Sequence, residues 1–408
     1  MFKILGKNQN KQSFSVPKSK SSVYQAPLKD SRVWRNVEIL KEILNGNLSR
    51  ASEYSGFGGL WRDLQDQEVQ KELKTILDDE QILALVKSTS TAYFTPKTVV
   101  EYCWQIVEKL GFEGGKVLEP CCGSGAFFDA MPDNIRRNSD ITGIELEAIS
   151  ASIAQAVNSD IKIVNDGYQY YSEQGQDLII GNPPYATFSV RDKFNPDLSD
   201  LKIHHAFLAR SIRLLRDGGL CVMVVPSYCL DSSTSHAREQ IAEIADLVFS
   251  CRLPDSIWED AKVTTDIVVY RKTAKPTSSD WKGLTKIELA CGYKDNLSNY
   301  YIENPEHILG DLELYEVYLS KEKRKRQGLK VTGSLAFVND RLPKLIDQLK
   351  PCYESERKAV VSSVVQFSTK SKASAPVVEN NELVALRDRL DAVALELSEI
   401  VNELGKVA

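Results

Sequence analysis

Short apolar runs alternate with helically spaced apolar residues through the middle of the chain. Apolar runs bounded by turn residues predict buried strands at 116–118, 141–144, 161–164, 177–180, 220–225, 247–253 and 266–270. Apolar residues at steps of three and four predict helices at 96–110, from 126, at 148–157 and at 205–215. Because strands and helices alternate, we expect an α/β fold with a mostly parallel sheet.

The segment before this alternation, residues 31–88, has a helical pattern and predicts an N-terminal helical extension. Within it, residues 54–61 combine three glycines with three aromatic residues, which indicates a turn packed closely on a flat surface. Further along, Thr95 is expected to cap the helix that begins with Pro96.

The two ends of the chain have different patterns. Residues 1–30 are rich in Lys, Ser and Gln, and they predict a flexible basic arm that either contacts phosphates or is a solvated tail. Residues 273–350 take the position of a target-recognition region, and residues 351–381 form a polar linker. Residues 382–408 carry an apolar seam at heptad spacing, at Leu383, Leu386, Leu390, Val393, Leu397, Ile400 and Leu404. This seam predicts a coiled-coil helix that mediates self-association or one that packs on its own protein.

Composition narrows the class of protein. The 408 residues are 42% hydrophobic and 26% charged, which is typical of a globular protein of two or three domains. No apolar run is long enough for a membrane span, and 8 cysteines without a Cys-x-x-Cys pair indicate free thiols in a reducing cytoplasm. The four histidines are scattered and none has a ligand-spaced partner, so we expect structural or surface roles for them and no metal site.

The predicted strand at 177–180 runs into Gly181-Asn182-Pro183-Pro184-Tyr185. The two prolines end the strand, so this motif lies at the carboxyl edge of the sheet, where open α/β folds bind ligands. There the Asn182 side-chain oxygen and the Pro183 carbonyl can accept the two hydrogens of a planar amino group while Tyr185 stacks on its ring. The alternative is a strand-ending turn with a half-buried tyrosine.

Acidic residues follow the first three predicted strands, and a glycine loop follows the first. The loop, with Gly123 and Gly125, has Phe128 where a dinucleotide fingerprint needs a glycine, and it lacks a P-loop lysine. Glu145 suits the hydroxyls of a ribose, and Asp166 suits the amine of an adenine. A nucleoside without phosphates fits best, and S-adenosylmethionine is the common example, with Glu119 near its amino-acid end.

In these motifs the sequence resembles the adenine-N6 DNA methyltransferases of the class I, S-adenosylmethionine-dependent type. The resemblance rests on residues 93–96, 119–125, 182–185, 218–227 and 253–270. It implies a Rossmann-like seven-stranded sheet over residues 89–272. It also implies a catalytic motif of Asn182, Pro183, Pro184 and Tyr185 and a cofactor site of Tyr93, Thr95, Pro96, Glu119, Pro120, Cys121, Gly123, Gly125, Glu145, Asp166 and Asn182. Residues 54–61 and 304–310 are similar to parts of phage- or mobile-element-borne methyltransferases.

The resemblance implies transfer of a methyl group to N6 of an adenine in DNA that has been flipped out of the duplex. RNA or a protein glutamine remains open as the substrate, as does a DNA-binding scaffold without catalysis. Nucleic acid is expected to contact Tyr185 and Phe188 and a basic cluster of Lys321, Lys323, Arg324, Lys325, Arg326 and Lys330, which is otherwise a solvated helix end. The recognition region is short, so we expect a short or relaxed target sequence.

Overall fold

The computed structural model describes residues 26–258, 262–277, 279–319 and 324–353. The predicted basic arm, apart from its last residues, and the predicted amphipathic helix at 382–408 lie outside these ranges. Among the described residues, no helix combines the length and apolar character that a bilayer crossing requires.

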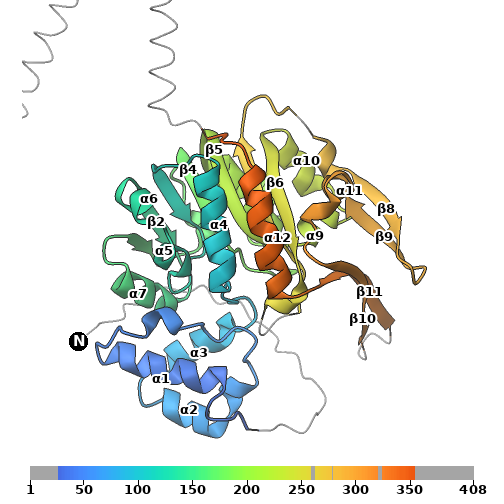
Figure 1. Ribbon diagram of the computed structural model, residues 1–408. Coiled ribbons are helices and arrows are strands. Elements are labelled where there is room, and N and C mark those ends of the chain that lie inside the picture. Colours follow the sequence, from blue (N-terminus) through green and yellow to red (C-terminus); the bar gives the residue numbers. More distant parts are fainter. Residues whose placement is uncertain (1–25, 259–261, 278, 320–323, 354–408) are drawn as a thin grey trace, which may run out of the picture. The chain divides into compact units, whose positions relative to one another are not determined.

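A seven-stranded sheet forms the centre of the described chain (Figure 1). Its strand order is β3-β2-β1-β4-β5-β7-β6, and every neighbouring pair is parallel except the two pairs that involve β7. The strands are β1 Lys116–Glu119, β2 Asp140–Ile144, β3 Lys162–Val164, β4 Gln176–Gly181, β5 Leu215–Pro226, β6 Ala245–Leu253 and β7 Thr265–Lys272. The predicted mostly parallel α/β sheet is therefore confirmed.

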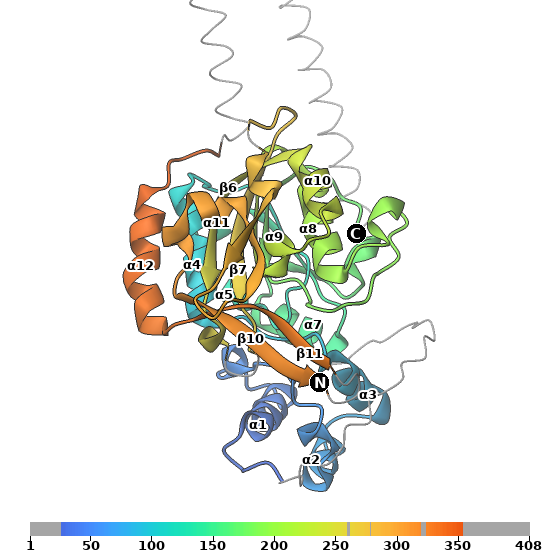
Figure 2. The same ribbon diagram turned by 90° about the vertical axis from the view of Figure 1, so that its right-hand side faces the viewer.

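Helices cover both faces of this sheet. Alternate residues of a strand point to opposite faces, and apolar residues on both faces are buried against these helices. Leu178 and Ile180 of β4 belong to one core, which contains α4 Lys97–Lys109 and α12 Leu335–Gln348. Ile179 belongs to the other core, which contains α8 Ile203–Leu214 and α10 His236–Ala242 (Figure 2). The helices α5 Ala126–Asp129, α6 Asp133–Arg137, α7 Ala148–Val157 and α9 Tyr228–Asp231 lie in the remaining connections between strands. Apolar residues on both sides of β4 explain why its sequence has no polar alternation.

The predicted N-terminal extension is helical, with α1 Arg32–Leu44, α2 Gln67–Leu73 and α3 Asp79–Ser88. The apolar stripe of α1 is buried as its period predicts, and Asp66 and Asp78 cap α2 and α3. The core of the extension also contains Ile149 and Ile153 of α7. The extension therefore shares its apolar core with helix α7, which lies between β2 and β3 in the chain.

The predicted recognition region has an α+β structure. It contains the hairpin of β8 Leu284–Glu288 and β9 Lys294–Ser298, helix α11 Asn299–Glu303, and the hairpin of β10 Asp311–Leu319 and β11 Arg324–Thr332. Its last helix, α12, packs against α4 and belongs to the core of the sheet (Figure 1). The backbone amides of Cys352 and Tyr353 then donate to the Leu110 carbonyl, so ordered packing continues into the first residues of the predicted linker.

The predicted cap of α4 is wrong. The helix begins at Lys97, Pro96 itself is its N-cap residue, and no side chain caps it. Pro96 has an extended backbone there, with ψ of 136°, so the chain reaches the helix one residue later than the Thr-Pro pattern predicts. Thr95 is consequently left outside the helix.

Candidate active site

The Asn-Pro-Pro-Tyr motif directly follows β4, which pairs with β1 on one side and β5 on the other. The strand order reverses between β1 and β4, and such a switch point opens a crevice outside the carboxyl ends of the strands. Asn182 is half-buried and Pro183 is buried. The fold therefore puts the predicted catalytic motif at the position where sheets of this kind bind ligands.

Asn182 has an unused acceptor. Its side-chain nitrogen lies 3.5 Å from the backbone oxygen of Tyr93, which orients the amide. Its side-chain oxygen is buried and has no hydrogen-bond partner. A buried carbonyl oxygen without a donor is costly, so this atom is poised to accept a hydrogen from a ligand. Tyr93 and Asn182, both predicted site residues, are thereby brought together.

Cys121 joins the glycine loop to the catalytic motif. Its thiol donates to the backbone carbonyl of Asn182 over 3.0 Å. Burial, together with the nearby Glu119 and Glu145, raises the pKa of the Cys121 thiol well above its usual value. The residue is therefore a protonated donor and not a nucleophile. This contact could not be expected from the sequence, since thiol donors have no recognisable spacing.

Tyr185 and Phe188 lie on the chain after the prolines. The Tyr185 hydroxyl donates to the carbonyl of Val224 near the end of β5, over 2.8 Å, and this bond fixes the ring at the edge of the sheet. Phe188 is 42% exposed although it is large and apolar. An exposed aromatic ring beside a catalytic motif is available to a flat ligand.

Glu119, the last residue of β1, is 1% exposed. One of its carboxyl oxygens is buried without a hydrogen-bond partner, and burial raises the pKa of this carboxyl well above its usual value. The Glu119 side chain lies against Gly181, where an added Cβ would come within 3.3 Å of it. An unpaired buried carboxyl favours a ligand that brings a donor or a positive charge.

Glu145, after β2, is tied to the glycine loop. The backbone amide of Gly123 donates to one of its oxygens over 2.9 Å, and the amide of Glu147 donates to the other over 2.7 Å. Burial raises the pKa of Glu145 to about 7. Asp166, after β3, is exposed, and its carboxylate accepts from the amide of Gly167. The acids that follow three neighbouring strands thus lie along one edge of the sheet.

The glycine-rich turn at 54–61 packs on this edge. The rings of Tyr54 and Phe94 meet edge to face, with centroids 6.1 Å apart, and Phe94 also lies against Gly56 and Gly123. The hydroxyl of Ser124 donates to the carbonyl of Tyr54 over 3.3 Å. The flat surface expected for this turn is therefore the Phe94 ring, which contacts the glycine loop from the side of the extension.

Replacing Gly56 by alanine is expected to lower the free energy of unfolding by about 1–3 kcal/mol and to weaken cofactor binding. Gly56 has φ of +62°, and its new methyl group would overlap the Phe94 ring, which lies against the glycine loop. Thermal melts and calorimetric titration with S-adenosylhomocysteine measure the two effects.

Gly46→Ala is the matched control for this change. Gly46 also has a left-handed backbone, with φ of +87°, but an added methyl group there meets no atom within 4 Å. The Gly46→Ala variant should lose stability through backbone strain alone, and its affinity for the cofactor should be unchanged. Equal cofactor affinity in the two variants would contradict the supporting role of the turn.

The predicted basic cluster is only partly described. Residues 320–323, which include Lys321 and Lys323, lie outside the described ranges, and for Arg324 and Arg326 only the backbone in β11 is described. Lys325 pairs with Glu316 over 2.7 Å, and Lys330 pairs with Glu313 over 3.3 Å. These two lysines are partly neutralised within the hairpin, so their contact with phosphates stays a prediction.

The expectation that the histidines lack ligand-spaced partners is wrong for two of them. His204 and His205 lie beside Cys229, and the three are buried. The pattern was missed because Cys229 lies 24 residues beyond His205 and is brought close only by the return of the chain through β5.

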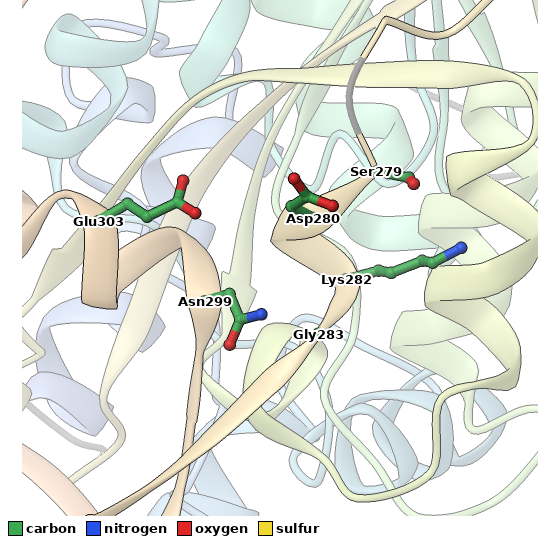
Figure 3. A pocket seen from close by; sticks show the side chains of 6 residues that line it. All are labelled: Ser279, Asp280, Lys282, Gly283, Asn299 and Glu303. Atoms are coloured by element: carbon green, nitrogen blue, oxygen red, sulfur yellow. The ribbon is translucent and has the colours of Figure 1, made fainter.

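A separate hollow of about 300 Å³ lies between the turn at 279–283 and α11 (Figure 3). Its lining residues are Ser279, Asp280, Lys282, Gly283, Asn299 and Glu303, and Lys282 points away from Glu303. None of the predicted site residues lines it, so it is distinct from the candidate active site.

The sheet order, the switch point and the acid-lined edge beside an amide acceptor define the class I methyltransferases, which use S-adenosylmethionine as cosubstrate. The model of the Eco57I restriction-modification methylase family matches residues 37–249, more than half of the chain. The chain therefore belongs to that family, and the resemblance seen in its motifs is confirmed.

Relatives in this group come from viruses and bacteria. The type II methyltransferase M.CvrRI of Paramecium bursaria Chlorella virus XZ-6E is 29% identical over 194 residues, which are 46% of this chain and 49% of that protein. The type II methyltransferase M.TthHB8I of Thermus thermophilus is 30% identical over 206 residues, 44% of this chain and 45% of that protein. The defense against restriction protein B of Escherichia phage P1 is 25% identical over 188 residues, 44% of this chain and 8% of that protein. The match thus covers half or less of each of these curated relatives.

Proposed function

We propose that the chain transfers a methyl group from S-adenosylmethionine to the N6 amino group of an adenine in DNA. The unpartnered, buried side-chain oxygen of Asn182 is the observation that carries this proposal. An exocyclic amino group has two hydrogens in the plane of its base, and the Asn182 oxygen with the Pro183 carbonyl forms a pair of acceptors for them. Membership of a restriction-modification methylase family supports the choice of DNA.

The residues of this chain suit the cosubstrate at both ends. Glu145 suits the ribose hydroxyls, and the unpaired carboxyl of Glu119 suits the charged amino-acid end. Leu146, which follows Glu145, is 70% exposed and offers an apolar surface to the adenine ring of the cosubstrate. When bound, S-adenosylmethionine supplies a methyl group that is already activated by its sulfonium.

Position and electrostatics therefore account for most of the catalysis. Accepting both amino hydrogens at Asn182 and Pro183 draws the nitrogen lone pair away from the base ring and makes it available. The nitrogen then bonds to the methyl carbon as the bond from that carbon to the sulfonium sulfur breaks, which leaves S-adenosylhomocysteine, and the methylated nitrogen afterwards releases one proton to solvent. Tyr185, whose ring is held by the bond to Val224, and the exposed Phe188 would stack on the flipped base.

Nucleoside analysis tests this proposal. Unmodified DNA, RNA and protein are each incubated with the chain and S-adenosylmethionine labelled in its methyl group, and treated DNA is digested to nucleosides. N6-methyladenine that carries the label is the expected product. Label that enters only RNA or protein would overturn the choice of substrate, and label on cytosine would overturn the choice of base.

Cofactor affinity is expected to rise with pH through about 7. Ribose hydroxyls donate to the charged form of Glu145, whereas burial raises the pKa of this carboxyl to about 7 in the cofactor-free protein. Below that pH the carboxyl must lose a proton before it can accept both hydroxyls, so binding at pH 6 should be roughly tenfold weaker than at pH 8. Calorimetric titration with S-adenosylhomocysteine across this range measures the effect.

Glu145→Gln is the control for this pH dependence, because it keeps the shape of the side chain and removes its titration. Its affinity should be lower at pH 8 and should not change between pH 6 and pH 8. A slope as steep as that of the unaltered protein would assign the titration to another group.

A further inference from the structure

His204, His205 and Cys229 form a buried cluster outside the candidate active site. The two histidines lie in the first turn of α8, and the cysteine lies in α9, which follows β5. One ring nitrogen of each histidine and the cysteine sulfur all lie within 4.8 Å of one another. The set thus brings two nitrogen donors and one sulfur donor together from two separate helices.

His204 has no hydrogen-bond partner to explain its burial. Its side chain is fully buried, and both of its ring nitrogens lack a partner. Its ring meets His205 edge to face at a centroid distance of 4.6 Å and Tyr228 at 4.9 Å. Ring contacts of this kind fill space, but they supply no partner for the lone pair on a ring nitrogen.

His205 is oriented as metal-ligating histidines are. Its ring hydrogen-bonds to the backbone of Tyr228, and since this bond raises the pKa of the ring, the ring is the donor. Donation from one nitrogen leaves a lone pair on the other. Metal-bound histidines commonly use such a backbone carbonyl to fix the tautomer and the ring plane.

We propose that His204, His205 and Cys229 bind a thiophilic transition-metal ion, Zn²⁺ or Cu⁺. Both ions favour sulfur and imidazole donors, and the cluster contains no carboxylate of the kind that Mg²⁺ and Ca²⁺ prefer. Zinc bonds of about 2.0–2.3 Å put ligand atoms roughly 3.5 Å apart, so the side chains close by about 1 Å on binding. With three protein donors, Zn²⁺ has a fourth position for a solvent molecule.

The ion would join the start of α8 to α9. Tyr185 lies nearby, since its hydroxyl donates to the carbonyl of Val224 near the end of β5, from which the chain leads into α9. The chain between Tyr185 and α8 contains the exposed Phe188, whose carbonyl accepts from the amide of Ile203. A bound ion would therefore stabilise the end of the loop between Tyr185 and α8, which carries the exposed Phe188.

Metal loading of the untagged full chain tests this site. The protein is stripped with a chelator, loaded with Zn²⁺ or, under reducing conditions, with Cu⁺, and passed through gel filtration before elemental analysis. Co²⁺ replaces Zn²⁺ in a parallel sample, because its absorption spectrum reports on sulfur ligation. We expect one equivalent of Zn²⁺ or Cu⁺, a thiolate-to-cobalt charge-transfer band and a higher melting temperature with the ion.

Cys229→Ser should lose the band and the bound ion, and its melting curve without metal shows whether it folds. Cys103→Ser is the matched control, because Cys103 is also fully buried but lies in α4. It should retain both signals. Failure to retain either ion, a cobalt spectrum without the thiolate band, or equal binding by the Cys229→Ser protein would overturn the proposal.

Discussion

Asn182→Ala is expected to slow methyl transfer by about 100- to 1,000-fold, the range seen when one preorganised polar group is lost from a catalytic site. The variant removes the acceptor whose oxygen is buried and unpartnered, while Tyr93, Cys121 and Glu145 keep their positions. Cofactor affinity should change little, because Glu119 and Glu145 are expected to carry most of it. Single-turnover transfer of a labelled methyl group and calorimetric titration separate the two quantities.

Two further variants serve as controls for the Asn182→Ala prediction. Asn134→Ala makes the same chemical change on the exposed surface of α6 and should leave the rate unchanged. Tyr185→Phe keeps the ring and removes the bond to Val224, so it should slow transfer less than Asn182→Ala does. An Asn182→Ala enzyme with an unchanged single-turnover rate would rule out the amide as an acceptor for the amino group.

Arg252→Met is expected to lower the free energy of unfolding by about 3–5 kcal/mol. Arg252 is 1% exposed and forms a two-pronged pair with Asp266, at 2.7 and 2.9 Å, together with a bond to Asp231 at 2.5 Å. Its guanidinium also lies over the ring of Tyr301, 4.3 Å from the centroid. The variant leaves Asp266, which is fully buried, without its charge partner.

Denaturant titration followed by fluorescence measures this loss of stability. Arg213→Ala is the comparison, because its pair with Asp197 is partly exposed and should contribute at most about 1 kcal/mol. If Arg252→Met and Arg213→Ala shift the midpoint equally, the buried network contributes no more than an ordinary surface pair.

Much of the fold could be predicted from the sequence because its signals are local. The run Leu178–Ile180 is fully buried on both faces of the sheet, so its uninterrupted apolar character identified β4, and the prolines identified its end. Helix α7 has the predicted bounds, since its apolar period and flanking turns are clear. The first residue of a helix was harder to predict: Thr95 was expected to cap α4, but Pro96 is its N-cap residue.

Contacts between distant segments could not be predicted in this way. Helix α12 packs on α4 from more than 200 residues away, and an amphipathic pattern does not say which partner a helix covers. The bond from Cys121 to the Asn182 carbonyl and the meeting of Cys229 with His204 arise only when β1, β4 and β5 lie in one sheet. The motifs and their spacing thus predicted which chemistry to expect. Which residues contact one another could be seen only once the strands were placed in the sheet.

The core that the helical extension shares with α7 limits where this chain can be cut and joined to another methyltransferase. Ile149 and Ile153 pack among side chains from residues 33–85, while Phe94 is enclosed by the turn that contains Gly56. A transferase module excised at residue 89 would expose this apolar surface to water and invite aggregation. Chimeras that exchange target specificity should therefore replace only residues between β7 and α12, and should keep the first 90 or so residues and α12 unchanged.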